Sequence, residues 1–185
     1  MANARGEQDQ KIEKKMLFVT GGARSGKSNY AQQLALQHAD NPVYVATARR
    51  IALDEEFEQR IKRHQADRNG NWTSIEEPLH VSKLSLEGRV VVIDCITLWL
   101  TNFFSLHKYD VEASLAAIKA ELNELKQLDS FLIIISNEIG LGVHADTEIG
   151  RKFTDLQGWT NQYVAAMSDE VVFMISGIPM IIKKR

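Results

Sequence analysis

The 185-residue chain has a single cysteine, Cys95, and so cannot form an internal disulfide bond. Small secreted domains commonly depend on several disulfides, whereas proteins of reducing compartments do not. The cysteine content therefore predicts a cytoplasmic protein without a disulfide framework.

Long apolar runs and long basic runs are also missing. No stretch approaches the roughly 18 apolar residues of a membrane-spanning helix, and the N-terminus lacks the apolar centre of a signal peptide. The formal net charge is −2 at pH 7, and no extended stripe of lysine and arginine occurs. These absences argue against a membrane span and against a general nucleic-acid binder.

The remaining composition is that of an ordinary globular domain, with 44% hydrophobic and 25% charged residues. A chain of this length can bury a complete core in one domain. The polar opening "MANARGEQDQKIEKK" cannot contribute to such a core. Residues 1–15 are therefore predicted to be a disordered extension, and residues 16–185 a single domain.

Short apolar runs alternate with amphipathic stretches along this domain. The runs are "MLFVT", "PVYVAT", "RVVVID", "SFLIIIS", "EVVFMIS" and "PMIIKK", and helical patterns lie between them at about 27–39, 54–66, 111–128 and 148–168. Nearly continuous apolar runs are typical of parallel strands covered on both faces. The alternation predicts an α/β fold with a doubly wound, mostly parallel sheet. Only "GIP" separates the last two runs, which predicts a C-terminal antiparallel hairpin.

The turn after the first run carries the strongest motif. Gly21 stands four residues before Gly26-Lys27-Ser28, which is the spacing of a phosphate-binding loop, or P-loop. Glycines let successive N–H groups point at an anion, and the following helix adds its positive dipole end. Lys27 is expected to reach the β- and γ-phosphates, and Ser28 to ligate Mg²⁺. The loop residues predicted to contact a nucleotide are Gly21, Gly22, Ala23, Arg24, Ser25, Gly26, Lys27 and Ser28.

Asp94 closes the third run, "RVVVID". Functional groups of open α/β sheets collect at the carboxyl ends of the strands, and a carboxylate there, beside a phosphate loop, suits a Mg²⁺-holding acid. The structural alternative is an aspartate that caps a helix or a turn. In the segment that follows, Trp99, Phe103 and Phe104 are expected to be core residues rather than a ligand platform.

Two further segments contain clustered basic residues. Arg49 and Arg50 end the second run, where they either clamp phosphate bidentately or remain solvated, and the sequence favours neither. His64 extends the apolar seam of the predicted helix 54–66, a position where histidine is commonly structural. Neutral imidazole is nevertheless a competent nucleophile at phosphorus, and the surroundings of His64 are cationic. The nearby arginines are Arg60, Arg63 and Arg68.

Polar residues follow the fourth run as well. Asn137 and Glu138 stand at its end, and two glycines make the next turn flexible. These residues form either a substrate wall or a capped loop, and the sequence leaves both open. The predicted helix beyond carries further polar candidates, Arg151, Asp155, Asn161 and Gln162.

These motifs together resemble those of one known family. "TGGARSGKS", "DCITLWLTN", "SNEIGLGV", "GWTNQ" and "SGIPM" are similar, in this order, to motifs of the bifunctional adenosylcobinamide kinases/adenosylcobinamide-phosphate guanylyltransferases of cobalamin assembly. The similarity runs from about Met16 to Lys183. It implies a P-loop NTPase-type fold, a homotrimer and two reactions. A nucleoside triphosphate, ATP or GTP, phosphorylates adenosylcobinamide, and GTP then donates GMP to the new phosphate.

The resemblance also implies roles for individual residues. His64 matches the family's nucleophile, which forms a GMP-histidine phosphoramidate, because Arg60-Ile61-Lys62-Arg63-His64 fits the pattern Arg-Ile-x-x-His. The chain departs from the family at Val143-His144, where Val-Pro is usual, and at Arg68-Asn69, where Arg-Pro is common. The positions that match contacts to the guanine nucleotide are Thr47, Ala48, Arg49, Gln65, Ala66, Asp67, Arg68 and Glu76.

Two other functions fit parts of the sequence. A small-molecule kinase would use the phosphate loop and Asp94 and would leave His64 in a structural role. A nucleotide-binding switch protein would also need the loop. The chain has no Asn-Lys-x-Asp motif, with which GTPase modules read guanine, and this argues against a switch.

Overall fold

The computed structural model describes residues 13–49 and 71–184, and within them seven strands form one sheet in the order β3-β2-β4-β5-β1-β6-β7. Six strands are parallel, and β7 pairs antiparallel with β6. The strands are β1 (Lys15–Gly21), β2 (Val43–Ala46), β3 (Thr73–Glu76), β4 (Val90–Asp94), β5 (Phe131–Ile135), β6 (Glu170–Ile175) and β7 (Ile178–Lys184). The predicted mostly parallel sheet with a C-terminal hairpin is confirmed.

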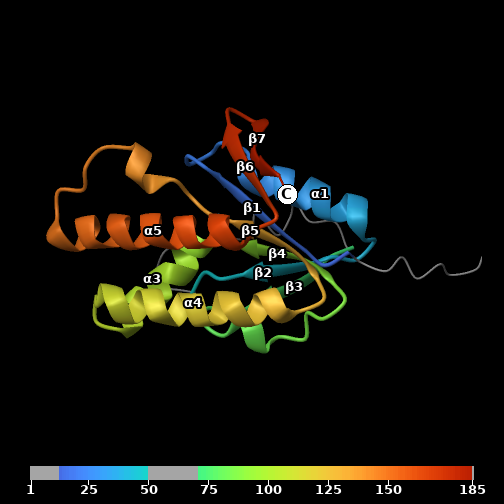
Figure 1. Ribbon diagram of the computed structural model, residues 1–185, viewed down its shortest axis with the longest axis horizontal. Coiled ribbons are helices and arrows are strands. Elements are labelled where there is room, and N and C mark those ends of the chain that lie inside the picture. The colour runs from blue at the N-terminus through green and yellow to red at the C-terminus, as the bar shows by residue number, and fades with distance from the viewer. Residues whose placement is uncertain (1–12, 50–70, 185) are drawn as a thin grey trace, which may run out of the picture.

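Helices cover both faces of this sheet (Figure 1). The helix α1 packs on one face, and α3, α4 and α5 pack on the other. Two short 3₁₀ helices, η1 and η2, lie in connecting segments. The bounds are α1 (Lys27–His38), η1 (Val81–Lys83), α3 (Ile96–Leu106), α4 (Val111–Gln127), η2 (Ile139–Leu141) and α5 (Glu148–Met167).

The alternation of side chains along each strand explains the two core layers. In β1, Leu17 and Val19 join the core beneath α1, whereas Phe18 joins the core beneath α3, α4 and α5. Successive side chains of a strand point to opposite faces, so a strand covered on both faces must be apolar at every position. In β5 all five residues are buried, as this requirement predicts.

Three predicted helices are confirmed within one residue at their ends. The predicted helix 54–66 lies outside the described residues, as do residues 1–12 of the predicted extension. β1 begins at Lys15, one residue before the predicted domain boundary, because the Lys15 N–H donates to the Ser130 carbonyl and its ammonium pairs with Glu170 at 2.8 Å. None of the helices in the described parts of the chain is both long and apolar enough to span a membrane.

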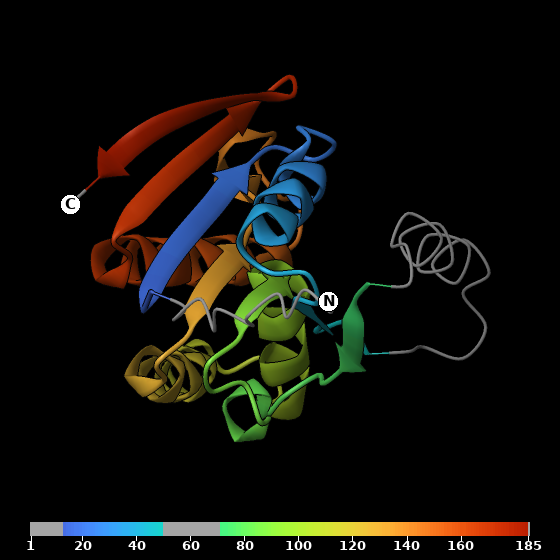
Figure 2. The same ribbon diagram turned by 90° about the vertical axis from the view of Figure 1, so that its right-hand side faces the viewer.

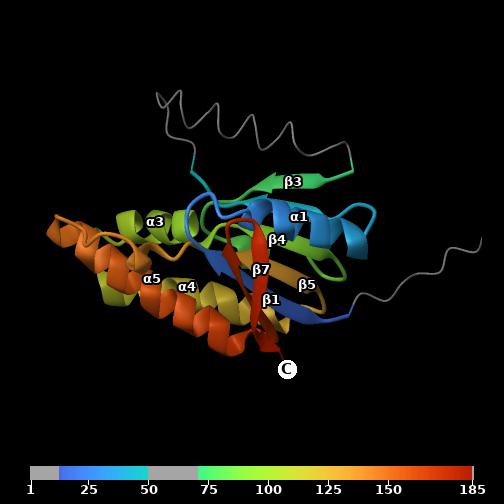
Figure 3. The same cartoon turned by 90° about the horizontal axis from the view of Figure 1, so that it is seen from above.

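One strand and one α-helix were not predicted, nor were the two short 3₁₀ helices. β3 is a four-residue strand, "TSIE", at the edge of the sheet (Figure 3), where half-exposed polar residues suffice. α3 was also missed, although its buried residues Ile96, Trp99, Leu100, Phe103 and Phe104 recur at helical spacing. Its burial confirms the expectation for Trp99, Phe103 and Phe104, which are all at most 4% exposed.

Edge strands lie on both sides of the sheet, β3 on one and the β6–β7 hairpin on the other (Figure 2). The hairpin turn at Ser176-Gly177 lies against the loop between β1 and α1. The N–H of Gly177 donates to the Ser25 carbonyl at 2.9 Å. The C-terminal hairpin therefore supports the segment that carries the phosphate-loop motif.

Close packing against β6 explains why Gly21 is a glycine. Its φ is +147°, and a Cβ atom built there would lie 2.5 Å from the carbonyl oxygen of Met174. That separation is far below van der Waals contact, and the obstacle is backbone that cannot rotate away. Gly22 differs, because a Cβ there would meet nothing within 4 Å.

We expect Gly21→Ala to lower the free energy of unfolding by about 3 kcal/mol, through steric overlap and an unfavourable backbone conformation. For a domain of this size, that corresponds to a fall of roughly 6 to 12 °C in Tm. Thermal unfolding without nucleotide measures the change, and Gly22→Ala is the matched control with an expected change within about 0.5 kcal/mol. Equal Tm values for the two variants would contradict the steric explanation.

Candidate functional site

The phosphate loop spans residues 22–26, between the end of β1 and the start of α1. Gly26 is the N-cap of α1 and has a φ of 94°, and Arg24 has a φ of 57°. The Ser25 N–H donates to the Gly22 carbonyl at 3.3 Å, which closes the loop on itself. Left-handed residues within a tight loop turn backbone N–H groups toward one side and form an anion-binding concavity at the N-terminus of a helix.

Lys27, the first residue of α1, is folded back across this loop. Its ammonium donates to the Gly22 carbonyl at 2.6 Å and to the Ser25 hydroxyl at 3.4 Å. The residue is only 7% exposed, which is rare for lysine. A buried ammonium satisfied mainly by loop oxygens places a positive charge where an anion bound by the loop would be stabilised.

Ser28 and Asp94 meet across the sheet edge. The Ser28 hydroxyl donates to Asp94 Oδ2 at 2.8 Å, and the Tyr44 hydroxyl donates to the same oxygen at 2.7 Å. Asp94 does not cap α3, whose N-cap is Cys95 and whose N-terminus receives no side-chain hydrogen bond. The helix-cap interpretation of Asp94 is therefore wrong, and its carboxylate faces the phosphate-loop helix instead.

The donor chemistry of this pair fits Mg²⁺. A hydroxyl and a carboxylate are hard oxygen ligands, and Mg²⁺ is commonly held by one or two carboxylates together with substrate phosphates and water. In the described ranges, no group of three or more His, Cys, Asp or Glu side chains gathers to form an all-protein metal cage. An open site of two protein oxygens is what a nucleotide-bound Mg²⁺ requires.

Cys95, directly after Asp94, takes no part in this chemistry. Complete burial and the neighbouring Asp94 carboxylate raise the pKa of its thiol to about 12. The thiolate is the nucleophile and metal ligand of cysteine, so a thiol with this pKa is inert near neutral pH.

The end of β2 lies beside the same carboxylate. The Thr47 N–H donates to the Asp94 carbonyl at 3.1 Å, and the Thr47 hydroxyl donates to the Cys95 carbonyl at 2.8 Å. Thr47 is fully buried, so its side chain holds the strand ends together. Ala48 is half-buried and Arg49 is exposed, and Arg50 lies outside the described residues.

Asn102 of α3 connects this strand end to the segment after β3. Its amide donates to the Thr47 carbonyl at 2.7 Å and to the Pro78 carbonyl at 2.8 Å. Glu76 is exposed at the end of β3, opposite Ala46 of β2. These contacts bring Thr47 and Glu76, two predicted nucleotide-contacting positions, together at the carboxyl ends of the strands.

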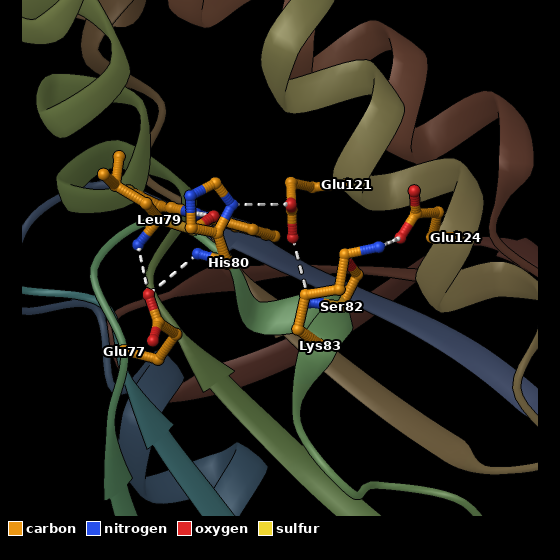
Figure 4. Close-up of polar contacts among 8 residues, drawn as sticks. Glu77, Leu79, His80, Ser82, Lys83, Glu121 and Glu124 are labelled. Carbon is orange, nitrogen blue, oxygen red and sulfur yellow. Dashed lines mark hydrogen bonds and ion pairs between the residues drawn. The ribbon is translucent and has the colours of Figure 1, made fainter.

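Charged side chains fix the segment after β3 on α4 (Figure 4). Glu77 accepts from the N–H groups of Leu79 and His80, both at 2.8 Å, and Glu121 of α4 accepts from the Ser82 N–H at 2.9 Å. The Lys83–Glu124 pair lowers the pKa of Glu124 mainly through its hydrogen bond, and both side chains are exposed. Short-range carboxylate contacts therefore hold the polypeptide that leads away from Glu76.

Asn137 and Glu138 lie between the phosphate loop and Asp94. Their strand, β5, pairs with β1 on one side and with β4 on the other. The Glu138 N–H donates to the Gly21 carbonyl at 3.1 Å, and its Oε1 accepts from the Thr20 hydroxyl at 2.7 Å and from the Asn161 amide at 3.0 Å. The residues that the sequence left open, as either a substrate wall or a capped loop, lie in two different places. Asn137, Glu138 and Asn161 lie at the sheet edge, while Arg151 donates to the Ala145 and Asp146 carbonyls and holds the loop.

Several predicted residues lie outside the described residues and are not placed. They include the predicted nucleophile and the positions after it, namely His64, Gln65, Ala66, Asp67 and Arg68, together with Arg60 and Arg63.

Three site residues were missed by sequence reasoning. Tyr44 lies inside an apolar strand and reads as a core residue, yet its hydroxyl reaches Asp94. Thr20 is the one polar residue of "MLFVT", and Asn102 lies between Leu100 and Phe103 in a mostly apolar segment. A polar side chain inside a buried run needs a hydrogen-bond partner. A polar residue within an apolar run was therefore the sequence signal that could have identified these three residues.

The fold and the site define a class of protein: an α/β P-loop nucleotide-binding domain with a hydroxyl–carboxylate pair suited to Mg²⁺. A sequence model of the family described as cobinamide kinase / cobinamide phosphate guanyltransferase matches residues 17–182. The chain belongs to this family.

Curated relatives agree with this assignment. The chain is 38% identical over 170 residues to the bifunctional adenosylcobalamin biosynthesis protein CobP of Pseudomonas aeruginosa, covering 90% of this chain and 96% of the relative. It is 32% identical over 183 residues to the bifunctional adenosylcobalamin biosynthesis protein CobU of Escherichia coli, covering 91% and 99%.

A solved structure supports the fold alone. A prototypical ATPase from the type III secretion system of pathogenic bacteria aligns with a TM-score of 0.51 and 8% identity, over 89% of this chain and 53% of that chain.

We expect Asp94→Asn to weaken nucleotide binding by about tenfold or more in Mg²⁺, because an amide keeps the hydrogen bonds but loses the negative charge that a cation requires. Calorimetric titration with a non-hydrolysable GTP analogue, in Mg²⁺ and in EDTA, gives the two affinities. Asp129→Asn, an exposed aspartate at the opposite end of β5, is the control. An equal loss in EDTA would show that Asp94 acts without a cation.

Proposed function

We propose that this protein catalyses two successive reactions on adenosylcobinamide. The first transfers the γ-phosphate of ATP or GTP to the aminopropanol hydroxyl, and the second transfers GMP from GTP to that phosphate. The observation that carries the proposal is the phosphate loop with its Ser28–Asp94 contact, in a chain that matches one bifunctional family over residues 17–182. The products are adenosylcobinamide-GDP and pyrophosphate.

The chain's own residues explain the first reaction. The loop N–H groups and the α1 N-terminus bind the phosphates, and Lys27 neutralises charge on the β- and γ-phosphates. Ser28 and Asp94 are the residues that would hold Mg²⁺, which when bound neutralises charge on the transferred phosphoryl group. Positioning and charge stabilisation dominate phosphoryl transfer, so no covalent protein group is needed in this step.

The second reaction needs a nucleophile, and His64 is our candidate. An imidazole nitrogen attacks the α-phosphorus of GTP, a P–N bond forms, and pyrophosphate leaves. The phosphate of adenosylcobinamide phosphate then attacks the same phosphorus and releases the histidine. Dividing one transfer into two displacements in this way lowers each barrier. The guanine nucleotide would be contacted by Thr47, Ala48, Arg49, Gln65, Ala66, Asp67, Arg68 and Glu76, as the family resemblance implies.

The covalent step can be tested with GTP labelled at the α-phosphate. We expect wild-type protein in Mg²⁺ to retain label after denaturation in alkali and to lose it in acid, as a phosphoramidate does. His64→Ala should retain none, and His38→Ala, on the exposed surface of α1, should retain the wild-type amount. If wild-type protein takes up no label, the guanylyltransferase half of the proposal is wrong.

Lys27→Ala tests the phosphate loop in an assay of γ-phosphate transfer to adenosylcobinamide. Loss of a charge aimed at the transferred phosphate should lower kinase kcat by about a hundredfold or more. Circular dichroism monitors whether the fold is retained. Unchanged turnover would remove the loop from the mechanism.

We also propose that the protein acts in the cytoplasm as a homotrimer. The supporting feature is the β6–β7 hairpin, which exposes an apolar surface at the sheet edge. Large exposed apolar patches mark interaction sites, and an uncovered edge strand is otherwise prone to aggregation. The exposed residues are Ile175, Ile178, Met180, Ile181 and Ile182, between 46% and 69% exposed.

Sedimentation equilibrium tests the assembly, because a trimer has about three times the 20.9 kDa chain mass. The double variant Ile178→Lys/Ile182→Lys places two charges on β7 and should shift the protein to monomer. Val143→Lys, at a residue that is 97% exposed in another part of the molecule, should keep the trimer. A monomeric wild-type protein would overturn this part of the proposal.

A further inference from the structure

Glu138 is one of the polar residues at the carboxyl ends of the strands. Neither phosphate binding by the loop nor the Ser28–Asp94 contact gives it a chemical role. It follows β5, the strand between the phosphate-loop strand β1 and the Asp94 strand β4. Neighbouring strands lie about 4.8 Å apart, so the end of β5 lies between the loop that grips phosphate and the carboxylate suited to Mg²⁺. Any triphosphate that reaches from the loop to Asp94 passes over this end.

The carboxylate of Glu138 is held through one of its two oxygens. Oε1 accepts from the Thr20 hydroxyl at 2.7 Å and from the Asn161 amide at 3.0 Å. Among the described residues, no protein group donates to Oε2. The residue is half-buried, so this second oxygen lies at the surface of the site rather than inside the core.

A buried network fixes the donor that faces Glu138. The Asn161 Oδ1 accepts from the Ser136 hydroxyl at 2.7 Å and from the Gln157 amide at 3.0 Å, and its Nδ2 donates to the Asn137 carbonyl at 3.1 Å. Rotating the Asn161 amide would set its oxygen against a carbonyl and a carboxylate, so its N–H groups must point at the Asn137 carbonyl and at Glu138. These donors therefore hold Oε1 of Glu138 in one position.

We propose that Glu138 is the general base of the kinase reaction, taking the proton from the acceptor hydroxyl as it attacks the γ-phosphorus. The new bond joins the hydroxyl oxygen to that phosphorus, the bond from the phosphorus to the β,γ-bridging oxygen breaks, and the nucleoside diphosphate leaves. The proton moves to Oε2 of Glu138. This inference rests on the proposed function, because it names the base for that acceptor.

The other groups at this edge are unsuited to the task. Asp94 accepts two hydroxyl hydrogen bonds and is the residue that would hold the cation, and Lys27 and Arg24 are cationic. Cys95 keeps its proton, since burial raises its pKa to about 12. From α5, only the neutral amide of Asn161 contacts Glu138, and η2 contributes no charged residue.

The test compares both reactions in Glu138→Gln and wild type. We expect kinase kcat to fall by about 10² to 10⁴, as removal of a general base does, with KM for the nucleotide changed by less than about threefold. Uptake of GMP label from GTP should be unchanged, because that reaction does not use the acceptor hydroxyl. Glu148→Gln, an exposed glutamate at the start of α5, is the matched control.

Thr20→Val gives a second measurement that does not remove the carboxylate. Because the base itself remains, kinase kcat should fall by less than about tenfold, well short of the loss expected in Glu138→Gln. Kinase turnover of Glu138→Gln within about threefold of wild type, or a Thr20→Val variant that loses as much turnover as Glu138→Gln, overturns the inference. If wild-type protein lacks kinase turnover, the proposed function itself fails and this inference fails with it.

Discussion

The hydrogen bond between the Ser28 hydroxyl and the Asp94 carboxylate is the contact on which the site depends. It joins the first turn of α1 to the end of β4, two strands away from the strand that precedes the loop. The contact requires the strand order β4-β5-β1, the N-terminus of α1 at the sheet edge and a tight loop before it. Because both partners are oxygen ligands, the same geometry that completes the fold prepares a site for a phosphate-bound cation.

The polar network beside this contact shows how the domain accommodates functional groups at the end of its core. Ser136, Gln157 and Asn161 are at most 6% exposed, and their side chains hydrogen-bond to one another. Buried polar groups are costly unless they are paired, so such a network selects one arrangement of side chains. In the described part of the chain, Gln157 Oε1 is the buried side-chain atom that lacks a partner. The network leaves that one acceptor unpaired and fixes the orientation of the Asn161 amide.

The sequence predicted the elements that local pattern determines. The inner strands are largely buried on both faces and are therefore nearly continuous in apolar residues, and the phosphate loop has a fixed spacing of glycine, lysine and serine. The edge strand β3 was missed because its "TSIE" residues form no apolar run. Pairings between distant residues were beyond prediction. Nothing near Tyr44 in the sequence indicates that its hydroxyl would meet Asp94, since only the assembled sheet sets β2 beside β4. The role of His64 came from a family pattern, and it stays a prediction.

The backbone contacts of the phosphate loop with the hairpin have a consequence for the newly made chain. Gly21 packs on the Met174 carbonyl, and Gly177 donates to Ser25, so the loop takes its shape from the β6–β7 hairpin. During synthesis the loop sequence leaves the ribosome well before this hairpin. A nascent chain that lacks the hairpin therefore holds the nucleotide-binding motif without the surface that shapes it. We expect such a chain to bind nucleotide only after β6 and β7 have been made and have paired with β1.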